Sequence, residues 1–324
     1  MSSETLIHVE HLYRHYGPLN AVIDVSFDLK RGEVLGFLGP NGAGKSTTMQ
    51  IITGNLAPSR GQIQICGMDL LDQPKQAKAC VGYLPEQPPL YRELTVDEFL
   101  NFAAQINRIK KDSQQSAVNK AKERCGLEKA GSRLISNLSK GYQQRVGIAQ
   151  AIIHSPDIIV LDEPTVGLDP IQIREIRSLI RELGQEHGVI LSTHILPEVL
   201  MTCDRVQIIN QGQLVFSDDI KNLNQRMAAR SLILSLQQPP DRQTLQAVQG
   251  VESIETIDDG RLRIYHAVGA SPASALAEAA VNNHWGLLEL TPETQTLEQI
   301  FVDITSSEHH HPTEEETIKG GQAA

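Results

Sequence analysis

The 324-residue sequence has no long apolar run, little cysteine and few aromatic residues. No stretch approaches the roughly 20 consecutive apolar residues of a membrane-spanning helix, and the polar start at residues 1–4 is unlike a signal peptide. The cysteines, Cys66, Cys80, Cys125 and Cys203, form no C-x-x-C pair, so their spacing suggests neither a zinc site nor a disulfide framework. We therefore expect a cytosolic chain with reduced thiols.

Basic residues are also scarce. The 29 Lys and Arg residues are outnumbered by 39 Asp and Glu residues, which gives a net charge of -10. A nucleic-acid-binding protein usually presents an excess of basic residues, so we expect no nucleic acid partner. The length suits one large and one small globular domain.

The most informative feature is a glycine-rich motif at residues 39–47, which fits the pattern G-x-x-x-x-G-K-[ST]. An apolar, strand-like run precedes it at residues 34–38, and a helical pattern follows. Backbone N–H groups in such a loop, together with the helix N-terminus, bind phosphate oxygens. We expect Lys45 to reach the β- and γ-phosphates of a nucleoside triphosphate and Ser46 to bind Mg²⁺. The predicted nucleotide-binding residues are Gly39, Pro40, Asn41, Gly42, Ala43, Gly44, Lys45, Ser46 and Thr47; the alternative is a glycine-rich turn that only links strand to helix.

The region around this motif alternates between strand-like and helical patterns. Expected strands lie at residues 6–9, 21–29, 61–65, 81–84, 158–161, 189–192 and 205–209, the first two as an antiparallel pair. Helical periodicity runs from 95 to about 125 and from 171 to 183. We therefore predict an α/β domain at residues 1–222, with a doubly wound, largely parallel sheet, an antiparallel β subdomain and a helical insert at about 90–155.

A second, smaller α/β domain is predicted at residues 223–305. Its expected strands are 232–236, 251–257, 261–265 and 286–290, and its expected helices are 242–248, 272–283 and 296–304. This βαββαβ order suggests a ferredoxin-like domain. Residues 306–324 lack apolar periodicity and are expected to be disordered, and we assign no metal to the histidines at 309–311.

Two further motifs lie between the phosphate loop and the end of the first domain. The apolar strand at 158–161 ends in Asp162 and Glu163, which suit a Walker B strand: Asp162 to bind Mg²⁺ and Glu163 to polarise the attacking water. Taken alone, this is also the pattern of a core strand that ends in a solvated acidic turn. Upstream, Ser139 is a good N-cap for a helix that begins there, and its free N–H groups suit an anion.

Over residues 5–220 the chain resembles the ATP-binding subunit of an ABC transporter. Residues 138–142 resemble the signature LSGGQ, with Lys140 and Tyr142 as departures; residues 167–169 resemble the D-loop, and His194 matches the switch histidine. The resemblance implies Mg²⁺-dependent ATP hydrolysis by a head-to-tail homodimer. The catalytic residues that it implies are Lys45, Glu163 and His194.

The resemblance also assigns binding roles outside the phosphate loop. Tyr16 matches the aromatic residue that stacks on adenine, while Ser139 and Gly141 are expected to bind the γ-phosphate from the second copy. The family's Mg²⁺-contacting Gln falls on Glu86, with Gln87 adjacent as the alternative.

Among ABC proteins, the segments 82–86, 89–91 and 294–301 resemble the gliding-motility and drug-resistance exporter ATPases. This implies a separate integral membrane permease docked beside residues 84–94, a peripheral position on the inner face of the cell membrane, and export. One alternative is a soluble ABC ATPase of DNA repair or the ribosome, although no long coiled-coil insertion or second ATPase set is present. Another is a regulator that binds ATP without hydrolysing it, against which the filled positions 163 and 194 argue.

Overall fold

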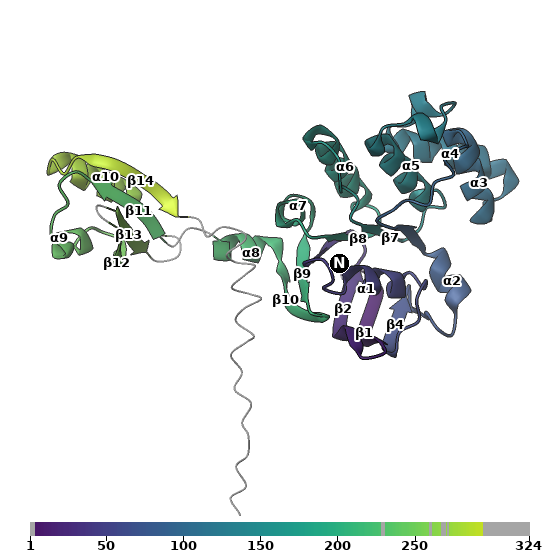
Figure 1. Ribbon diagram of the computed structural model, residues 1–324, viewed down its shortest axis with the longest axis horizontal. Helices are drawn as coiled ribbons and strands as arrows, with labels where there is room; N and C mark the ends of the chain where they lie inside the picture. Colours follow the sequence, from purple (N-terminus) through teal and green to yellow (C-terminus); the bar gives the residue numbers. More distant parts are fainter. Residues whose placement is uncertain (1–3, 228–230, 259–260, 267–269, 271, 294–324) are drawn as a thin grey trace, which may run out of the picture. The chain divides into compact units, whose positions relative to one another are not determined.

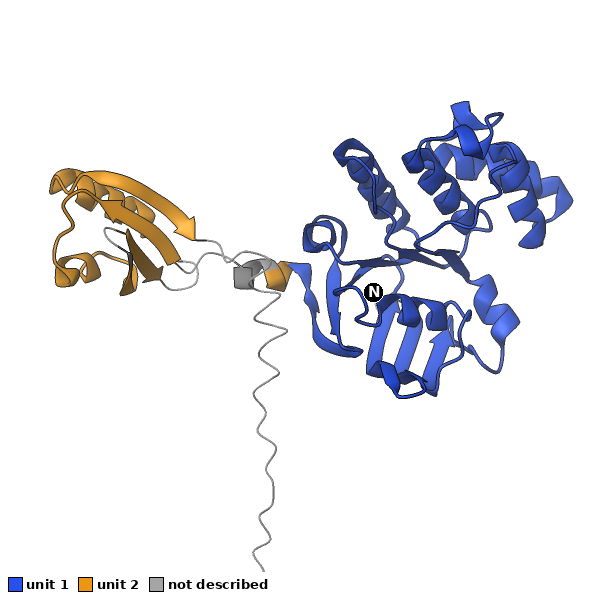
Figure 2. Ribbon diagram, in the orientation of Figure 1, with its two compact units in different colours: residues 1–220 blue, residues 221–324 orange. Residues whose placement is uncertain are grey.

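The computed structural model describes residues 4–227, 231–258, 261–266, 270 and 272–293. The chain divides into two compact units, residues 1–220 and residues 221–324 (Figure 2). Each has a hydrophobic core of its own and is described by itself. Within the described ranges, no helix combines the length and apolar character that crossing a membrane requires.

A six-stranded sheet forms the centre of the first unit (Figure 1). Its order is β10-β9-β3-β8-β7-β6, and every neighbouring pair is parallel except β10 with β9. The strands are β3 (Val34–Leu38), β6 (Val81–Leu84), β7 (Ile158–Asp162), β8 (Gly188–Thr193), β9 (Arg205–Asn210) and β10 (Gln213–Asp219). β3, β7 and β8 are buried along their whole length, as expected for a sheet covered on both faces. Because parallel strands end at one edge, the loops after β3, β6, β7 and β8 meet there.

An antiparallel sheet of order β2-β1-β4-β5 shares a core with the central sheet. Its strands are β1 (Thr5–Tyr16), β2 (Leu19–Lys30), β4 (Arg60–Ile65) and β5 (Met68–Asp69). Helix α1 (Lys45–Ile52) buries Met49, Ile51 and Ile52 in the same hydrophobic cluster as residues from both sheets. The helix that begins at the glycine-rich loop is thereby fixed to both sheets.

The remaining helices of this unit cover the central sheet or extend from it. α2 (Pro74–Ala79) precedes β6, and α6 (Pro170–Leu183) and α7 (Leu196–Thr202) follow β7 and β8. The helical insert contains α3 (Val96–Ile106), α4 (Lys111–Cys125) and α5 (Lys140–Ile152), with short 3₁₀ turns at Glu128–Ala130 and Ile135–Asn137. A capping box starts α3, because Thr95 Oγ1 accepts from the Glu98 N–H (3.2 Å) and Glu98 accepts from the Thr95 N–H (2.8 Å).

Helix α8 (Ile220–Met227) begins at the last residue of the first unit and continues into the second. The second unit also contains β11 (Ser231–Leu236), α9 (Arg242–Gln246), β12 (Val251–Asp258), β13 (Arg261–His266), α10 (Ala273–Asn282) and β14 (Leu287–Glu293). Its sheet has the order β12-β13-β11-β14, and all neighbouring strands are antiparallel. Alternate residues of β11 pack with Ile264, Leu276 and Trp285 in its core. The elements β11 to β14 follow the predicted βαββαβ order, while a ferredoxin-like assignment and domain limits at 222 and 305 stay predictions.

The α/β class, the mostly parallel sheet and the antiparallel subdomain agree with the sequence predictions. Five short or edge elements were not predicted: β5, α2, α7, β10 and α8. β10 lies at the sheet edge with its residues half-buried or exposed, and its apolar run, residues 214–216, is only three residues long. The helix predicted at 296–304, the segment 306–324 and its histidines lie outside the described residues.

Candidate functional site

A cavity of about 480 Å³ lies where the loops after β3, β6, β7 and β8 meet. Its volume falls in the range of small-molecule sites. The cavity brings together residues that are up to 178 positions apart in the sequence. It is lined by Tyr16, Leu19, Ala21, Asn41, Gly42, Gly44, Lys45, Ser46, Thr47, Glu86, Glu163, Val166 and His194.

The glycine-rich loop has a backbone shape that other residues would not tolerate. Gly44 has a φ of 108°, and a Cβ added there would lie 2.5 Å from the Ala21 carbonyl oxygen. Lys45, the first residue of α1, is 5% exposed, and its Nζ donates to the carbonyl oxygens of Gly39 (2.8 Å) and Pro40 (3.2 Å). The loop therefore presents a buried ammonium group and a helix N-terminus to the cavity, a combination that binds anions.

Asp162 is the last residue of β7, and Glu163 follows it directly. Asp162 is 2% exposed, and its Oδ1 has no hydrogen-bond partner. Glu163 has a φ of 50°, a left-handed conformation that is costly for a residue with a Cβ and that often occurs at functional sites. Its N–H donates to the Ser192 carbonyl oxygen (2.9 Å), which ties this turn to β8.

The Glu163 carboxylate lies between two partners that come from different loops. Lys45 Nζ is 3.5 Å from Oε1, and His194 Nδ1 donates to Oε2 at 2.9 Å. Glu163 is 6% exposed, and a charge so deeply buried requires such partners. Nearby, burial and then the charge of Asp162 raise the pKa of the Tyr83 phenol, so this side chain stays neutral beside the acidic turn.

Tyr16 and Glu86 lie at the rim of the same cavity. Tyr16 is 44% exposed, and the Arg14 guanidinium carbon lies 4.6 Å from its ring centroid. Glu86 lines both this cavity and a second one of about 620 Å³, whereas Gln87 lines only the second. Of the two residues left open by the sequence, Glu86 is therefore the one that faces the phosphate loop.

The signature residues lie elsewhere on the same unit. Ser139 caps α5 by accepting from the Tyr142 N–H (3.4 Å), and a Cβ added to Gly141 would lie 2.1 Å from Oε1 of Gln172. Neither Ser139 nor Gly141 is among the residues that line the 480 Å³ cavity. Within one copy, the structure thus brings together every predicted catalytic residue but not the signature.

Sequence analysis missed Glu198, which links the two loops that follow β7 and β8. This residue of α7 is 1% exposed and accepts from Thr165 Oγ1 (2.6 Å) and Thr193 Oγ1 (2.9 Å). Arg177 lies 3.8 Å from the same carboxylate. The one sequence signal for Glu198 is that it is an acidic residue among apolar neighbours in residues 195–200, four positions after His194.

A phosphate loop between a buried strand and a helix, with a buried carboxylate on a nearby strand, defines a P-loop nucleotide site. Residues 22–166 match the ABC transporter family. The chain is 33% identical to BcrA, the bacitracin transport ATP-binding protein of Bacillus licheniformis, over 93% of this chain and 97% of BcrA. It is 30% identical to LnrL, the linearmycin resistance ATP-binding protein of Bacillus subtilis (strain 168), over 93% of this chain and 98% of LnrL.

Solved structures give the same result for the first unit. The structure of an ATP-binding subunit of an ABC transporter superposes on this chain with a TM-score of 0.62 and 34% sequence identity. The superposition covers 68% of this chain and 92% of that subunit. The protein cbiO1 from Clostridium perfringens, part of the ABC transporter complex cbiONQ, superposes with a TM-score of 0.62 and 30% sequence identity. The superposition covers 68% of this chain and 91% of cbiO1.

The chain therefore belongs to the ATP-binding proteins of ABC transporters. The predicted resemblance and the ABC-type fold are confirmed. As a member of this family, the chain is a transport-coupled ATPase, and the alternative of an ATPase of DNA repair or the ribosome is not supported.

We expect Glu198→Ala to lower the stability of the first unit by about 2 kcal/mol, because the hydroxyls of Thr165 and Thr193 lose their acceptor. Glu198→Gln keeps one acceptor oxygen and should lose less. The unfolding transition, followed by calorimetry, measures both. Glu128→Ala, in an exposed surface turn, is the control. A Glu198→Ala variant as stable as the unmodified chain would contradict this assignment.

Proposed function

We propose that two copies of the chain bind ATP head to tail and hydrolyse it at sites that both copies complete. The observation that carries this proposal is the division of the site residues. The phosphate loop, Glu163 and His194 line one cavity, whereas the exposed Ser139 and the buried Gly141, both at the start of α5, lie outside its lining. A second copy, turned head to tail, supplies Ser139 and the Gly141 N–H group to the γ-phosphate, and the helix N-terminus of α5 favours that anion.

Within one copy, we assign the binding roles to residues that line the cavity. Tyr16 stacks on the adenine, and the backbone of residues 39–47 surrounds the phosphates. Lys45 exchanges its contacts with the carbonyl oxygens of Gly39 and Pro40 for phosphate oxygens. Its positive charge then neutralises negative charge on the transferred group.

Glu163 is proposed to orient and polarise the water that attacks the γ-phosphate. Its carboxylate already accepts from His194 Nδ1, which fixes the direction in which its free lone pairs point. His194, 42% exposed at the cavity wall, keeps its other ring nitrogen for the γ-phosphate. The left-handed backbone of Glu163 directs this side chain away from the line of β7 and toward Lys45.

The oxygen atoms near the phosphate loop suit Mg²⁺ as the cofactor. Asp162 Oδ1 is buried without a hydrogen-bond partner, and the Ser46 hydroxyl and the Glu86 carboxylate belong to residues that line the cavity. Hard oxygen donors of this kind are the usual ligands of Mg²⁺ beside a nucleotide. When bound, Mg²⁺ would neutralise charge on the β- and γ-phosphates.

We expect Glu163→Gln to reduce ATP turnover at least 100-fold while ATP binding is kept, because the amide no longer accepts a proton from water. Phosphate release and the binding of a fluorescent ATP analogue measure the two effects. Glu128→Gln, on the surface turn, is the matched control. Turnover at the normal rate in Glu163→Gln would remove Glu163 from the mechanism.

Ser139→Ala should abolish hydrolysis while the monomer's affinity for ATP is unchanged. Because this change also removes the N-cap of α5, Ser139→Asp serves as a second variant: it keeps a capping acceptor but repels the phosphate. Both should be inactive, while the exposed neighbour variant Ser136→Ala should be active.

A mixture of Ser139→Ala and Glu163→Gln copies tests the composite site directly. A head-to-tail heterodimer of the two contains one site with intact Glu163 and intact Ser139, so the mixture should regain activity that neither variant has alone. Failure to regain activity, with both variants folded and mixed dimers formed, would sink the composite arrangement.

The proposed partner is an integral membrane permease that contacts an exposed aromatic hollow on the helical insert. The hollow, about 230 Å³, is lined by Tyr91, Glu93, Leu94 and Phe102. The Tyr91 ring lies 5.4 Å from that of Phe102, and both side chains are more than a third exposed. Apolar rings that remain accessible beside the segment 84–94 suit a helix of a partner protein.

A permease contact also places the chain on the inner face of the cell membrane. LnrL is named for linearmycin resistance, and YbhF of Escherichia coli (strain K12) is named as a probable multidrug ABC transporter ATP-binding protein. Such names suit export, because removing a drug from the cell confers resistance to it. We propose export for this chain on that ground, with the cargo selected by the permease.

We expect Phe102→Glu to lower the amount of chain that co-purifies with the permease from membranes at least tenfold, because a charge replaces an aromatic contact. Leu71→Glu, which changes an apolar residue outside the hollow that is more exposed than Phe102 (57% against 39%), should leave co-purification unchanged. Equal recovery of both variants would exclude the hollow as the contact.

A further inference from the structure

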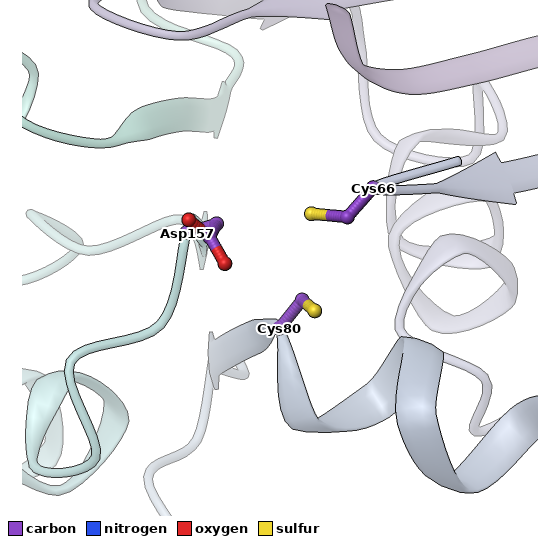
Figure 3. A group of neighbouring side chains, drawn as sticks. All are labelled: Cys66, Cys80 and Asp157. Carbon is purple, nitrogen blue, oxygen red and sulfur yellow. The ribbon is translucent and has the colours of Figure 1, made fainter. Parts of the chain in front are cut away.

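Three side chains with metal-binding atoms converge at a place that the nucleotide chemistry does not use. Cys66 follows β4, Cys80 lies between α2 and β6, and Asp157 immediately precedes β7 (Figure 3). The two sulfur atoms and a carboxylate oxygen of Asp157 all lie within 4.8 Å of one another. Cys80 and Asp157 lie at the amino ends of β6 and β7, so this cluster is at the opposite edge of the central sheet from the phosphate loop.

The backbone at Cys66 is one that cysteine seldom adopts. Cys66 (φ 49°) and Gly67 (φ 74°) are both left-handed and form the two-residue turn between β4 and β5, in which Ile65 pairs with Met68. Asn, Asp and Gly are the residues that favour such a turn. The Cys66 N–H donates to the Leu6 carbonyl oxygen (2.7 Å), so the turn is fixed to β1. The Cys66 thiol is thus held in place by a backbone conformation that Asn, Asp or Gly would adopt more easily.

The charge around the cluster suits a divalent cation. Two thiolates and one carboxylate carry three negative charges when they act as ligands. Arg31 donates to Asp157 Oδ1 at 2.6 Å but also to Glu4 at 2.8 Å, so its positive charge is shared between two carboxylates. A divalent cation would balance two of the three negative charges that the ligands contribute.

The ligand set favours a thiophilic cation over the alternatives. Tetrahedral Zn²⁺ with Zn–S bonds of about 2.3 Å places its ligand atoms roughly 3.5–4 Å apart, a spacing that small side-chain rotations reach from here. Asp157 accepts from Arg31 through Oδ1, and its second carboxylate oxygen can serve as a ligand beside the two sulfur atoms. All three residues are partly exposed, which leaves a path for the ion and for a water ligand.

We propose that Cys66, Cys80 and Asp157 bind one Zn²⁺ ion, with water as the fourth ligand, and that this ion joins the antiparallel sheet to the edge of the central sheet. This site could not be predicted from sequence, because its ligands lie 14 and 77 positions apart instead of the two or three of a zinc motif. The site is independent of ATP binding and of the permease.

The test uses the full chain, reduced and freed of metal with a chelator, and titrated with Co²⁺ as a spectroscopic substitute for Zn²⁺. We expect one equivalent of Co²⁺ to give thiolate-to-cobalt charge-transfer absorption, and one equivalent of Zn²⁺ to displace it. Zn²⁺ should also raise the melting temperature of the chain. Because imidazole gives no such band, ions held by the histidines at 309–311 are distinguished.

Cys66→Asn is the decisive variant, because asparagine suits the left-handed turn and the fold should be kept. Cys66→Asn and Cys80→Ser should each abolish the charge-transfer band and lower the affinity for Zn²⁺ at least tenfold. Asp157→Asn should lower this affinity about tenfold. Cys203→Ala, which removes a buried thiol outside the cluster, should keep both the band and the Zn²⁺ affinity. Cobalt binding without the thiolate band, a band that persists in Cys66→Asn, or a Cys66–Cys80 disulfide that forms equally in the presence of Zn²⁺ would overturn the proposal.

Discussion

The buried ion pair between Lys45 and Glu163 is the contact on which the arrangement of this site depends. Each residue is about one-twentieth exposed, and neither charge is stable at such depth without the other and its hydrogen bonds. Lys45 follows β3 and Glu163 follows β7, and β8 lies between these strands. The pair therefore spans the strand that leads to His194, and this explains how His194 reaches the same carboxylate.

Glu198 extends this arrangement beneath the surface of the cavity. It fixes Thr165 and Thr193 to one carboxylate, so the turn after Glu163 and the residue before His194 are held by a single group in α7. A movement of either loop must break a hydrogen bond to a buried charge. The loops after β7 and β8 are thus coupled to each other, which suits the proposal that Glu163 and His194 act together on water and phosphate.

Much of the first unit could be predicted from sequence because its signals are local. The phosphate loop is continuous over residues 39–47, and β3, β7 and β8 are apolar runs whose burial leaves little ambiguity. β10 was not predicted, because its apolar run, residues 214–216, is only three residues long and the rest of this edge strand is polar. The cluster of Cys66, Cys80 and Asp157 could not be predicted because these residues are distant in sequence. The role of Glu198 could not be predicted because it depends on Thr165, 33 positions away, as well as on the nearby Thr193. The left-handed backbone of Glu163 likewise has no signal in a residue type that rarely adopts it.

The two edges of the central sheet differ in how freely their contacts can change. The cysteine cluster and the nucleotide cavity lie at opposite edges. At the carboxyl edge, loops must rearrange around phosphate, so their contacts are hydrogen bonds and ion pairs that can be exchanged. At the amino edge, Cys66 and Cys80 pack against the same hydrophobic cluster that holds α1. An ion bound there would join β4 to the β6–β7 edge without touching the cavity. Because the two sites share a core but no ligand, stiffening one edge should stabilise the fold while the exchangeable contacts at the other edge stay free to move.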